Sequence, residues 1–187
     1  MTPGLPATRC SSTSPWPSCA ARHPALAVAA AIAVITIAAA IAATVTPELG
    51  PATAPHPTLH GTPDEVVSIV VQNLRTLIAP LLLIAGRWHT GRVTRHVGDL
   101  LVATLVIANA TLVGLALGRY PTQLPAYLPH LPLEDGALAI AVGAWLERRT
   151  KQRTGTPTPS LSRTALLMLT VTIAAAIVET YAVPHPG

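Results

Sequence analysis

Polar side chains that could do chemistry interrupt the apolar stretches of this sequence. An ionisable group inside a membrane span costs about 2.5–3.5 kcal/mol by insertion scales, and such groups usually mark functional positions. The candidates for a buried polar cluster are Gln72, Asn73, Arg75, Asn109, His130, Glu134 and Glu179. Carboxylates, amides and an imidazole can hold a proton, pair with a guanidinium or hydrogen-bond one helix to another.

The first of these residues lie on one predicted helix. Ser68, Gln72, Arg75 and Thr76 recur at i, i+4, i+7 and i+8 and so share one side of it, with Asn73 beside the stripe. Arg75 falls near the middle of the stretch, and buried charges are retained mainly when paired. We therefore predict that Arg75 pairs with a carboxylate of a later helix, in a polar pocket open to the outside.

Two carboxylates are candidates for that pairing, Glu134 and Glu179. Each also has a simpler interpretation. Glu134 and Asp135 fall in a first helical turn after Pro132, where the helix dipole favours negative charge. Glu179 shares a face with Thr172 and lies near a helix end, where a carboxylate can reach the headgroups. The sequence leaves these interpretations open, together with the alignment of His130 on the helix that follows it.

The elements that must position these residues are membrane helices. Half of the 187 residues are hydrophobic and only 11% are charged, whereas soluble domains carry about 25% charged residues. Apolar stretches of about 20 residues are long enough to cross a bilayer as helices. The predicted fold is all-α, a polytopic integral membrane bundle of about five helices at 24–45, 66–86, 98–118, 132–146 and 164–183. The fourth stretch is short for a span.

The loops between these stretches alternate between basic and nearly free of Lys and Arg. The positive-inside rule then predicts a multi-pass protein of the cell membrane with a cytoplasmic N-terminus and an extracytoplasmic C-terminus. Trp88 and Trp145 fall at the predicted inner boundary, and Tyr120, Tyr127 and Tyr181 at the outer one, as in aromatic belts. The same orientation explains the net charge of +4 better than nucleic-acid binding does.

Residues 24–187 are predicted to form the transmembrane domain. Residues 1–23, which precede it, are predicted to be a disordered cytoplasmic segment. Cys10 and Cys19 there match no metal or redox spacing, so we expect no metal site and no cofactor. The first apolar stretch exceeds the 7–15 residues of a typical signal peptide and is predicted to be an uncleaved helix, with cleavage as the alternative. Residues 47–63 read as an extended outer loop and 151–160 as an inner loop.

Small residues predict a close contact between helices. Gly114 and Gly118 form a GxxxG pair, and Thr104, Ile107 and Thr111 continue that face. Small side chains let helices approach closely, so the pair is interpreted as a packing face without a ligand.

Several of these residues carry a resemblance. Tyr-Leu-Pro-His-Leu-Pro-Leu-Glu at 127–134 resembles the Leu-Pro-His-Gly-x-x-Glu stretch of the stage II sporulation protein M family, with Leu131 in place of the usual Gly. Ile-Val-Glu-Thr-Tyr-Ala-Val-Pro at 177–184 is similar to that family's terminal helix, and Asn73-Leu74 and 109–114 are similar to its earlier membrane segments. The resemblance covers residues 64–185 and implies a non-enzymatic membrane protein that works with cell-wall-degrading partners.

Three functions compete on these observations. The first is a membrane scaffold that organises extracytoplasmic peptidoglycan-remodelling partners, with the lipid bilayer, and a second copy of the chain, as further contacts. The second is a transporter of a small solute or ion that uses the buried Arg/Glu pocket, although no inverted repeat is visible. The third is an intramembrane hydrolase using His130, Glu134 and Glu179, for which no HExxH or GxSxG motif is present. We expect that the protein is not an enzyme.

Overall fold

Five α-helices make up the described part of a computed structural model of the chain, which covers residues 24–46, 48, 62–121, 129–154 and 160–182. No strand occurs in these ranges, and the predicted all-α fold is confirmed. In chain order the helices are α2 (Pro24–Val45), α3 (Pro63–Ala85), α4 (Arg92–Arg119), α6 (Leu131–Thr154) and α7 (Leu161–Ala182).

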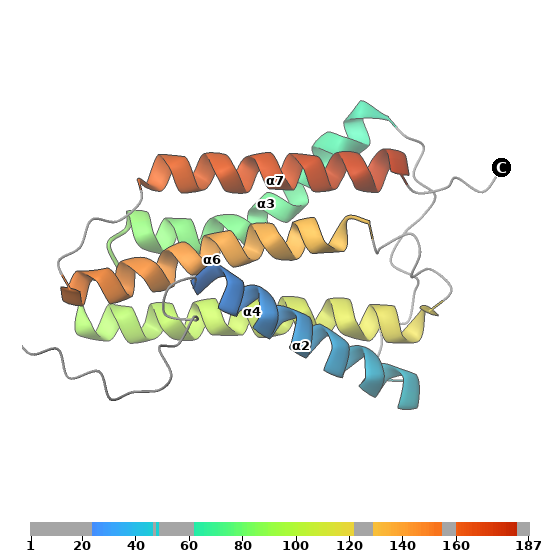
Figure 1. The fold of residues 1–187 in the computed structure, drawn as a ribbon, viewed down its shortest axis with the longest axis horizontal. Helices are drawn as coiled ribbons and strands as arrows, with labels where there is room; N and C mark the ends of the chain where they lie inside the picture. The colour runs from blue at the N-terminus through green and yellow to red at the C-terminus, as the bar shows by residue number, and fades with distance from the viewer. Residues whose placement is uncertain (1–23, 47, 49–61, 122–128, 155–159, 183–187) are drawn as a thin grey trace, which may run out of the picture.

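Successive helices run in opposite directions, so the bundle has two distinct ends (Figure 1). One end, called the basic end here, collects the start of α2, the turn between α3 and α4, the end of α6 and the start of α7. The basic side chains at this end are Arg87, Arg92, Arg95, Arg148, Arg149, Lys151 and Arg163. The opposite end collects the starts of α3 and α6 and the ends of α2, α4 and α7.

Helix α6 is the centre of the bundle and contacts each of the other four helices. Its buried residues form an almost continuous run from Ala137 to Trp145, of small and branched apolar types. The helix is not among the candidate spans, because Glu134 and Asp135 lie at its start and further charged residues follow Trp145. Its neighbours shield it, so it depends less on its own hydropathy than a peripheral helix does.

The other four helices, α2, α3, α4 and α7, are each long and apolar enough to cross a bilayer. Their outward faces carry large exposed apolar side chains, among them Leu26 and Val34 on α2, Leu112 on α4 and Leu166 on α7. In water such faces would be costly, whereas lipid tails solvate them. The chain is a multi-pass membrane protein.

Two glycines allow a close contact between α2 and α4. A Cβ atom built at Gly114 would overlap the Thr36 carbonyl oxygen, and one at Gly118 would overlap that of Ala40. Gly114 and Gly118 are therefore covered by α2 of the same chain and are not an outward surface available to a second copy. The predicted continuation of their face is wrong, because Thr104 and Ile107 are exposed.

Local signals fix the start of α3. The Thr62 hydroxyl accepts a hydrogen bond from the Glu65 backbone N–H at 3.4 Å, and the Thr62 N–H donates to Glu65 Oε2 at 3.0 Å. This reciprocal capping box, with Pro63 at the first helical position, satisfies donors that a helix start otherwise leaves unpaired.

Helices α3 and α7 each begin three residues before their predicted starts, and two other helices depart further from the prediction. Helix α4 begins at Arg92, six residues before the predicted start at 98, and α6 continues to Thr154, eight residues past the predicted end at 146. The interpretation of 151–160 as a loop is therefore wrong for 151–154. Hydropathy marks where a helix leaves the hydrocarbon, and Arg, Lys, Glu and Gln are good helix formers that prolong it.

Some predictions fall on residues outside the described ranges. These are the disordered segment 1–23 with Cys10 and Cys19, most of the loop 47–63, Tyr127, residues 155–159 of the inner loop, and the C-terminal residues from 183 onward.

Candidate functional site

The main candidate site lies toward the opposite end of the bundle, where α3 and α6 are joined by side chains. Asn73 Nδ2 on α3 donates a hydrogen bond of 2.5 Å to Glu134 Oε1 on α6. Glu134 is held in the first turn of α6, where its backbone N–H and that of Leu133 both donate to the His130 carbonyl oxygen, at 3.1 and 2.9 Å. The carboxylate thus binds across to another helix in addition to lying near its own helix start.

A cavity of about 50 Å³ adjoins this hydrogen bond, enclosed by α3, α4, α6 and α7. Its polar lining, called the carboxylate cluster here, is Asn73, Thr76, Asn109, Glu134, Asp135 and Thr172. Leu77, Val113 and Leu138 complete the wall. No Lys or Arg is among the described lining residues. The volume suits a water molecule or a bare ion, because a water needs about 10–15 Å³ of such space and two to four polar partners.

Glu179 and His130 are buried near this cluster's end of the bundle. Glu179 is 5% exposed, on the α7 face that also buries Thr172, Ala175 and Ala176, so its carboxylate is turned into the bundle and does not reach outward to the headgroups. His130 is 4% exposed and immediately precedes α6. Within the described ranges, no group of three His, Cys, Asp or Glu side chains is arranged to hold a metal ion.

Arg75 and Gln72 do not join the cluster. Both side chains are exposed, and within the described residues Arg75 forms no ion pair with Glu134 or Glu179. The predicted pairing is therefore not formed. Of the polar stripe predicted on this helix, Ser68, Gln72 and Arg75 face outward, whereas Thr76 lines the cavity. Asn73, beside the stripe, points inward because the buried face of α3 runs through Leu77, Leu81 and Ile84.

Asp135 connects the cavity with a second, larger space. It also lines a groove of about 400 Å³ that is otherwise almost entirely apolar and lies between α2, α4 and the start of α6. The Thr36 hydroxyl on this groove is buried and has no hydrogen-bond partner among the described residues. The carboxylate of Asp135 therefore stands between the polar cavity and an apolar groove.

A second polar cluster, which sequence reasoning missed, lies at the basic end. Asp99 on α4 pairs with Arg149 on α6 at 3.0 Å and accepts a hydrogen bond of 3.1 Å from Trp145 Nε1. The His89 ring meets the Trp145 ring edge-on, with centroids 6.3 Å apart. These four residues are the basic-end cluster. Two features of the sequence could have predicted this cluster. Asp99 is the only acidic residue of α4, and the predicted topology brings residues 148–151 to the same end of the bundle.

The role predicted for Trp145 is wrong. Trp145 is fully buried and packs on Gly98, where an added Cβ would lie 2.6 Å from the indole ring, so it is not part of a lipid-facing belt. Trp88 at the same end is 38% exposed, and Tyr181 at the opposite end is 54% exposed. Hydropathy cannot distinguish a Trp that anchors a helix in the headgroups from one that fills the bundle.

His89 lies in the turn between α3 and α4, outside the membrane-spanning helices. Burial, followed by the positive charges of Arg148 and Arg87, lowers the pKa of His89 below its ordinary value. The imidazole is therefore favoured in its neutral form, which suits its contact with the edge of Trp145.

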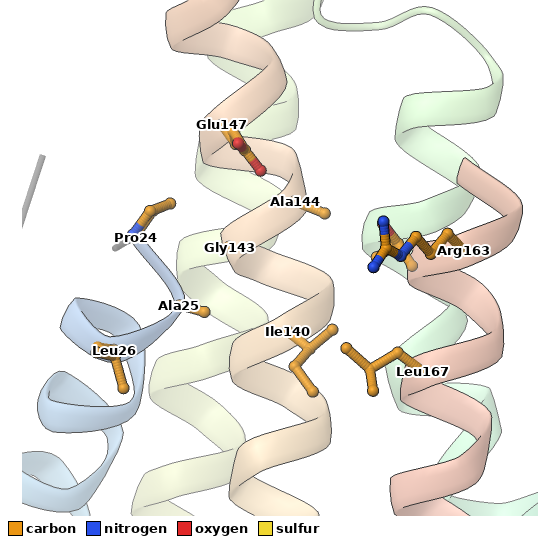
Figure 2. A pocket seen from close by; sticks show the side chains of 10 residues that line it. Pro24, Ala25, Leu26, Ile140, Gly143, Ala144, Glu147, Arg163 and Leu167 are labelled. Atoms are coloured by element: carbon orange, nitrogen blue, oxygen red, sulfur yellow. The ribbon is translucent and has the colours of Figure 1, made fainter. Parts of the chain in front are cut away.

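A groove of about 420 Å³ runs beside α6 at the basic end (Figure 2). Figure 2 shows α6 between the start of α2 and α7, with Ile140 and Leu167 extending toward each other and Arg163 extending from α7 toward α6. Glu147 lies on its rim and pairs with Lys151 on the same helix. The described lining of this groove is mostly apolar and contains no group of side chains arranged for catalysis.

No known protein family, curated protein or solved structure matches this chain. The resemblance to the stage II sporulation protein M family therefore stands on the residues quoted for it.

Proposed function

We propose that this chain is a non-enzymatic scaffold or regulator of the cell membrane, of the stage II sporulation protein M type, which organises extracytoplasmic peptidoglycan-remodelling partners. The positive-inside rule orients the basic end toward the cytoplasm. The N-terminus is then cytoplasmic, the C-terminus extracytoplasmic, and the carboxylate cluster lies in the outer half of the bilayer.

The observation that carries the proposal is how the polar residues of the bundle are used. Asn73 and Glu134 are engaged with each other across two helices, and the adjoining cavity is only about 50 Å³. Binding sites for small organic molecules occupy about 300–1,000 Å³. The hydrogen bond thus holds α3 against α6, and the cavity beside it has no room for an organic solute, as a scaffold requires.

The resemblance adds a reason for the placement of these groups. Asn73, His130, Glu134 and Glu179, which belong to the quoted motifs, come from α3, the start of α6 and α7. Asn73 and Glu134 are hydrogen-bonded to each other, and His130 and Glu179 are buried. We propose that the motifs hold the helices in the arrangement that extracytoplasmic partners recognise.

The test is partner recovery from native membranes. A tagged chain is crosslinked in cells, purified and analysed by mass spectrometry. Cell-wall hydrolases should be enriched with the natural chain, reduced with Glu134→Leu, which leaves the Asn73 amide without an acceptor, and retained with Glu134→Gln, which keeps one. Enrichment no greater than with an unrelated multi-pass protein would rule the scaffold out.

A second candidate function, passage of a small cation or proton, is favoured by one observation. Two carboxylates line the cavity, and one of them, Asp135, also lines the larger apolar groove. This function predicts sodium or proton flux in proteoliposomes that falls with Asp135→Asn, whereas Arg75→Gln leaves it unchanged because Arg75 faces outward. The scaffold predicts no flux above that of empty liposomes.

A further inference from the structure

We propose that the outward face of α3 docks a transmembrane helix of a different protein, one that carries a carboxylate opposite Arg75. The proposal rests on the scaffold function, because it names the chemistry of a partner that such a scaffold would hold within the bilayer. The α3 outer face is the set of exposed side chains Ser68, Val71, Gln72, Arg75, Ile78 and Leu82.

The direction of Arg75 follows from the packing of α3. Leu77, Leu81 and Ile84 are 3–7% exposed and pack into the bundle. Arg75 lies two residues before Leu77, and at 100° per residue the two side chains point about 200° apart around the helix. The guanidinium therefore leaves the bundle on the side away from α6 and α7.

The depth of Arg75 makes this exposure costly. It is ten residues from the end of α3 at Ala85 and twelve from its start at Pro63, so each helix end is about 15–18 Å away along the axis at 1.5 Å per residue. A guanidinium at that depth meets lipid tails unless a partner supplies an anion. The neighbouring Gln72 amide and Ser68 hydroxyl would also gain hydrogen-bond partners from such a helix.

Within the described part of the chain, no carboxylate pairs with Arg75. Glu134 and Asp135 line the internal cavity, and Glu179 is buried within the bundle. Asp99 is already paired with Arg149 at the basic end. A second copy docked through the same face would bring two Arg75 side chains together, and like charges repel most strongly in a medium of low dielectric constant. No carboxylate among the described residues pairs with the Arg75 guanidinium, and we therefore infer that the partner is a different polypeptide.

The apolar members of the face supply the rest of a helix–helix contact. Val71, Ile78 and Leu82 are 46%, 39% and 59% exposed and flank Arg75 along the helix. Association of helices in lipid depends on close packing together with interhelical polar contacts. A partner helix with one acidic residue among small and apolar residues fits both parts of this surface.

The direct test uses a synthetic probe. A leucine-rich transmembrane peptide with one central Glu, and a matched peptide with Gln in its place, are mixed with the full chain in phosphatidylcholine vesicles, and association is followed by energy transfer. The Glu peptide should associate about tenfold more tightly than the Gln peptide. Arg75→Leu should remove the difference, and because Arg75 makes no ion pair within the described part of the chain, this variant should keep the natural melting temperature.

Two outcomes would overturn the proposal. One is equal association of the two peptides with the natural chain, or a difference that persists in Arg75→Leu. The other is loss of the difference when phosphatidylglycerol is added, because that result would assign Arg75 to an anionic lipid headgroup.

The second test works in native membranes. A photoreactive residue replaces Gln72 or, as a control, Leu166 on α7, which is 66% exposed. Position 72 alone should give an adduct with another membrane protein, lost with Arg75→Glu and kept with Arg75→Lys. An adduct of two copies of this chain would refute the docking. An adduct with a protein unrelated to the cell wall would support the docking and contradict the scaffold role. Recovery of cell-wall hydrolases without an adduct at position 72 would support the scaffold role and contradict the docking.

Discussion

The carboxylate cluster and the basic-end cluster both place acidic groups between helices, but they compensate the negative charge differently. Asp99 has the guanidinium of Arg149 at 3.0 Å and the indole N–H of Trp145 at 3.1 Å. Glu134 has the neutral amide of Asn73, and no cationic side chain is among the described residues that line its cavity.

This difference separates two uses of an acidic side chain placed between helices. A carboxylate paired with a guanidinium of the same chain serves to hold two helices together through a charge-assisted contact. A carboxylate held by neutral donors in a low-dielectric site is the one that can take up a proton or a small cation. We therefore expect substitutions at the basic end to cost stability, and neutralising substitutions in the carboxylate cluster to be tolerated.

The largest effect should come from removing the centre of the basic-end cluster. Trp145→Ala empties a fully buried site and should lower the free energy of unfolding by about 3–5 kcal/mol. Trp88→Ala, at the same end but 38% exposed, is the matched control and should cost far less. Thermal unfolding of the purified variants in detergent measures both, and equal losses would contradict the buried role of Trp145.

The next effect compares one glycine from each end. An added Cβ at Gly98 would lie 2.6 Å from the buried Trp145 ring, so Gly98→Ala should cost about 1–3 kcal/mol through overpacking. At Gly136, in the first turns of α6, a Cβ meets nothing within 4 Å, so Gly136→Ala should gain about 0.5–1 kcal/mol from helix propensity. The melting temperatures should move in opposite directions; a shift of the same sign in both would argue against tight packing at the basic end.

A smaller effect on the free energy of unfolding should distinguish Asp99 from Glu134. Asp99→Asn keeps an acceptor for Trp145 but leaves Arg149 without its counter-charge. Since both partners are partly exposed, the loss should be about 1 kcal/mol. Glu134→Gln keeps the acceptor for Asn73 and removes a charge that no cation balances, so unfolding should be unchanged or slightly harder. Denaturation of both variants at pH 7 gives the comparison, which fails if Glu134→Gln is the more damaging.

The smallest effect is a pH dependence at the basic end. The pKa of His89 is lowered in the folded protein by burial, Arg148 and Arg87, so the unfolded chain binds the proton more readily. This contribution to stability is complete above about pH 6.5, the ordinary pKa of histidine, and is lost as the pH falls through the folded value. Unfolding curves recorded between pH 5 and 8 should show the loss, and His89→Gln should remove it; an unchanged pH profile in that variant would exclude His89 as its source.

Prediction from sequence succeeded where composition alone decides the result. The five helices and the bounds of α2 follow from runs of apolar residues, because the hydrocarbon demands a self-satisfied backbone over about 20 residues. The start of α4 and the end of α6 did not follow. The charged residues at these helix ends lie outside the hydrocarbon but are still helical, and hydropathy does not predict that they belong to a helix.

The candidate site was predicted only in part. Asn73, Asn109 and Glu134 line one cavity, but the partner proposed for the carboxylates, Arg75, lies on the far side of α3. A period of 3.6 residues tells which side chains share a face and leaves open which way the face points. In a soluble protein the apolar face must turn inward, whereas in lipid both the surroundings and the interior are apolar, so this rule is lost.

The sequence by itself determined that the chain forms apolar helices, that basic residues gather at one end and that polar residues interrupt the spans. Only the tertiary structure decided which polar residues meet, because the rotation of each helix is set by side-chain packing. The close approach of α2 to Gly114 and Gly118 and the fit of Trp145 onto Gly98 are examples. These contacts involve residues far apart in the chain, and no local pattern encodes them.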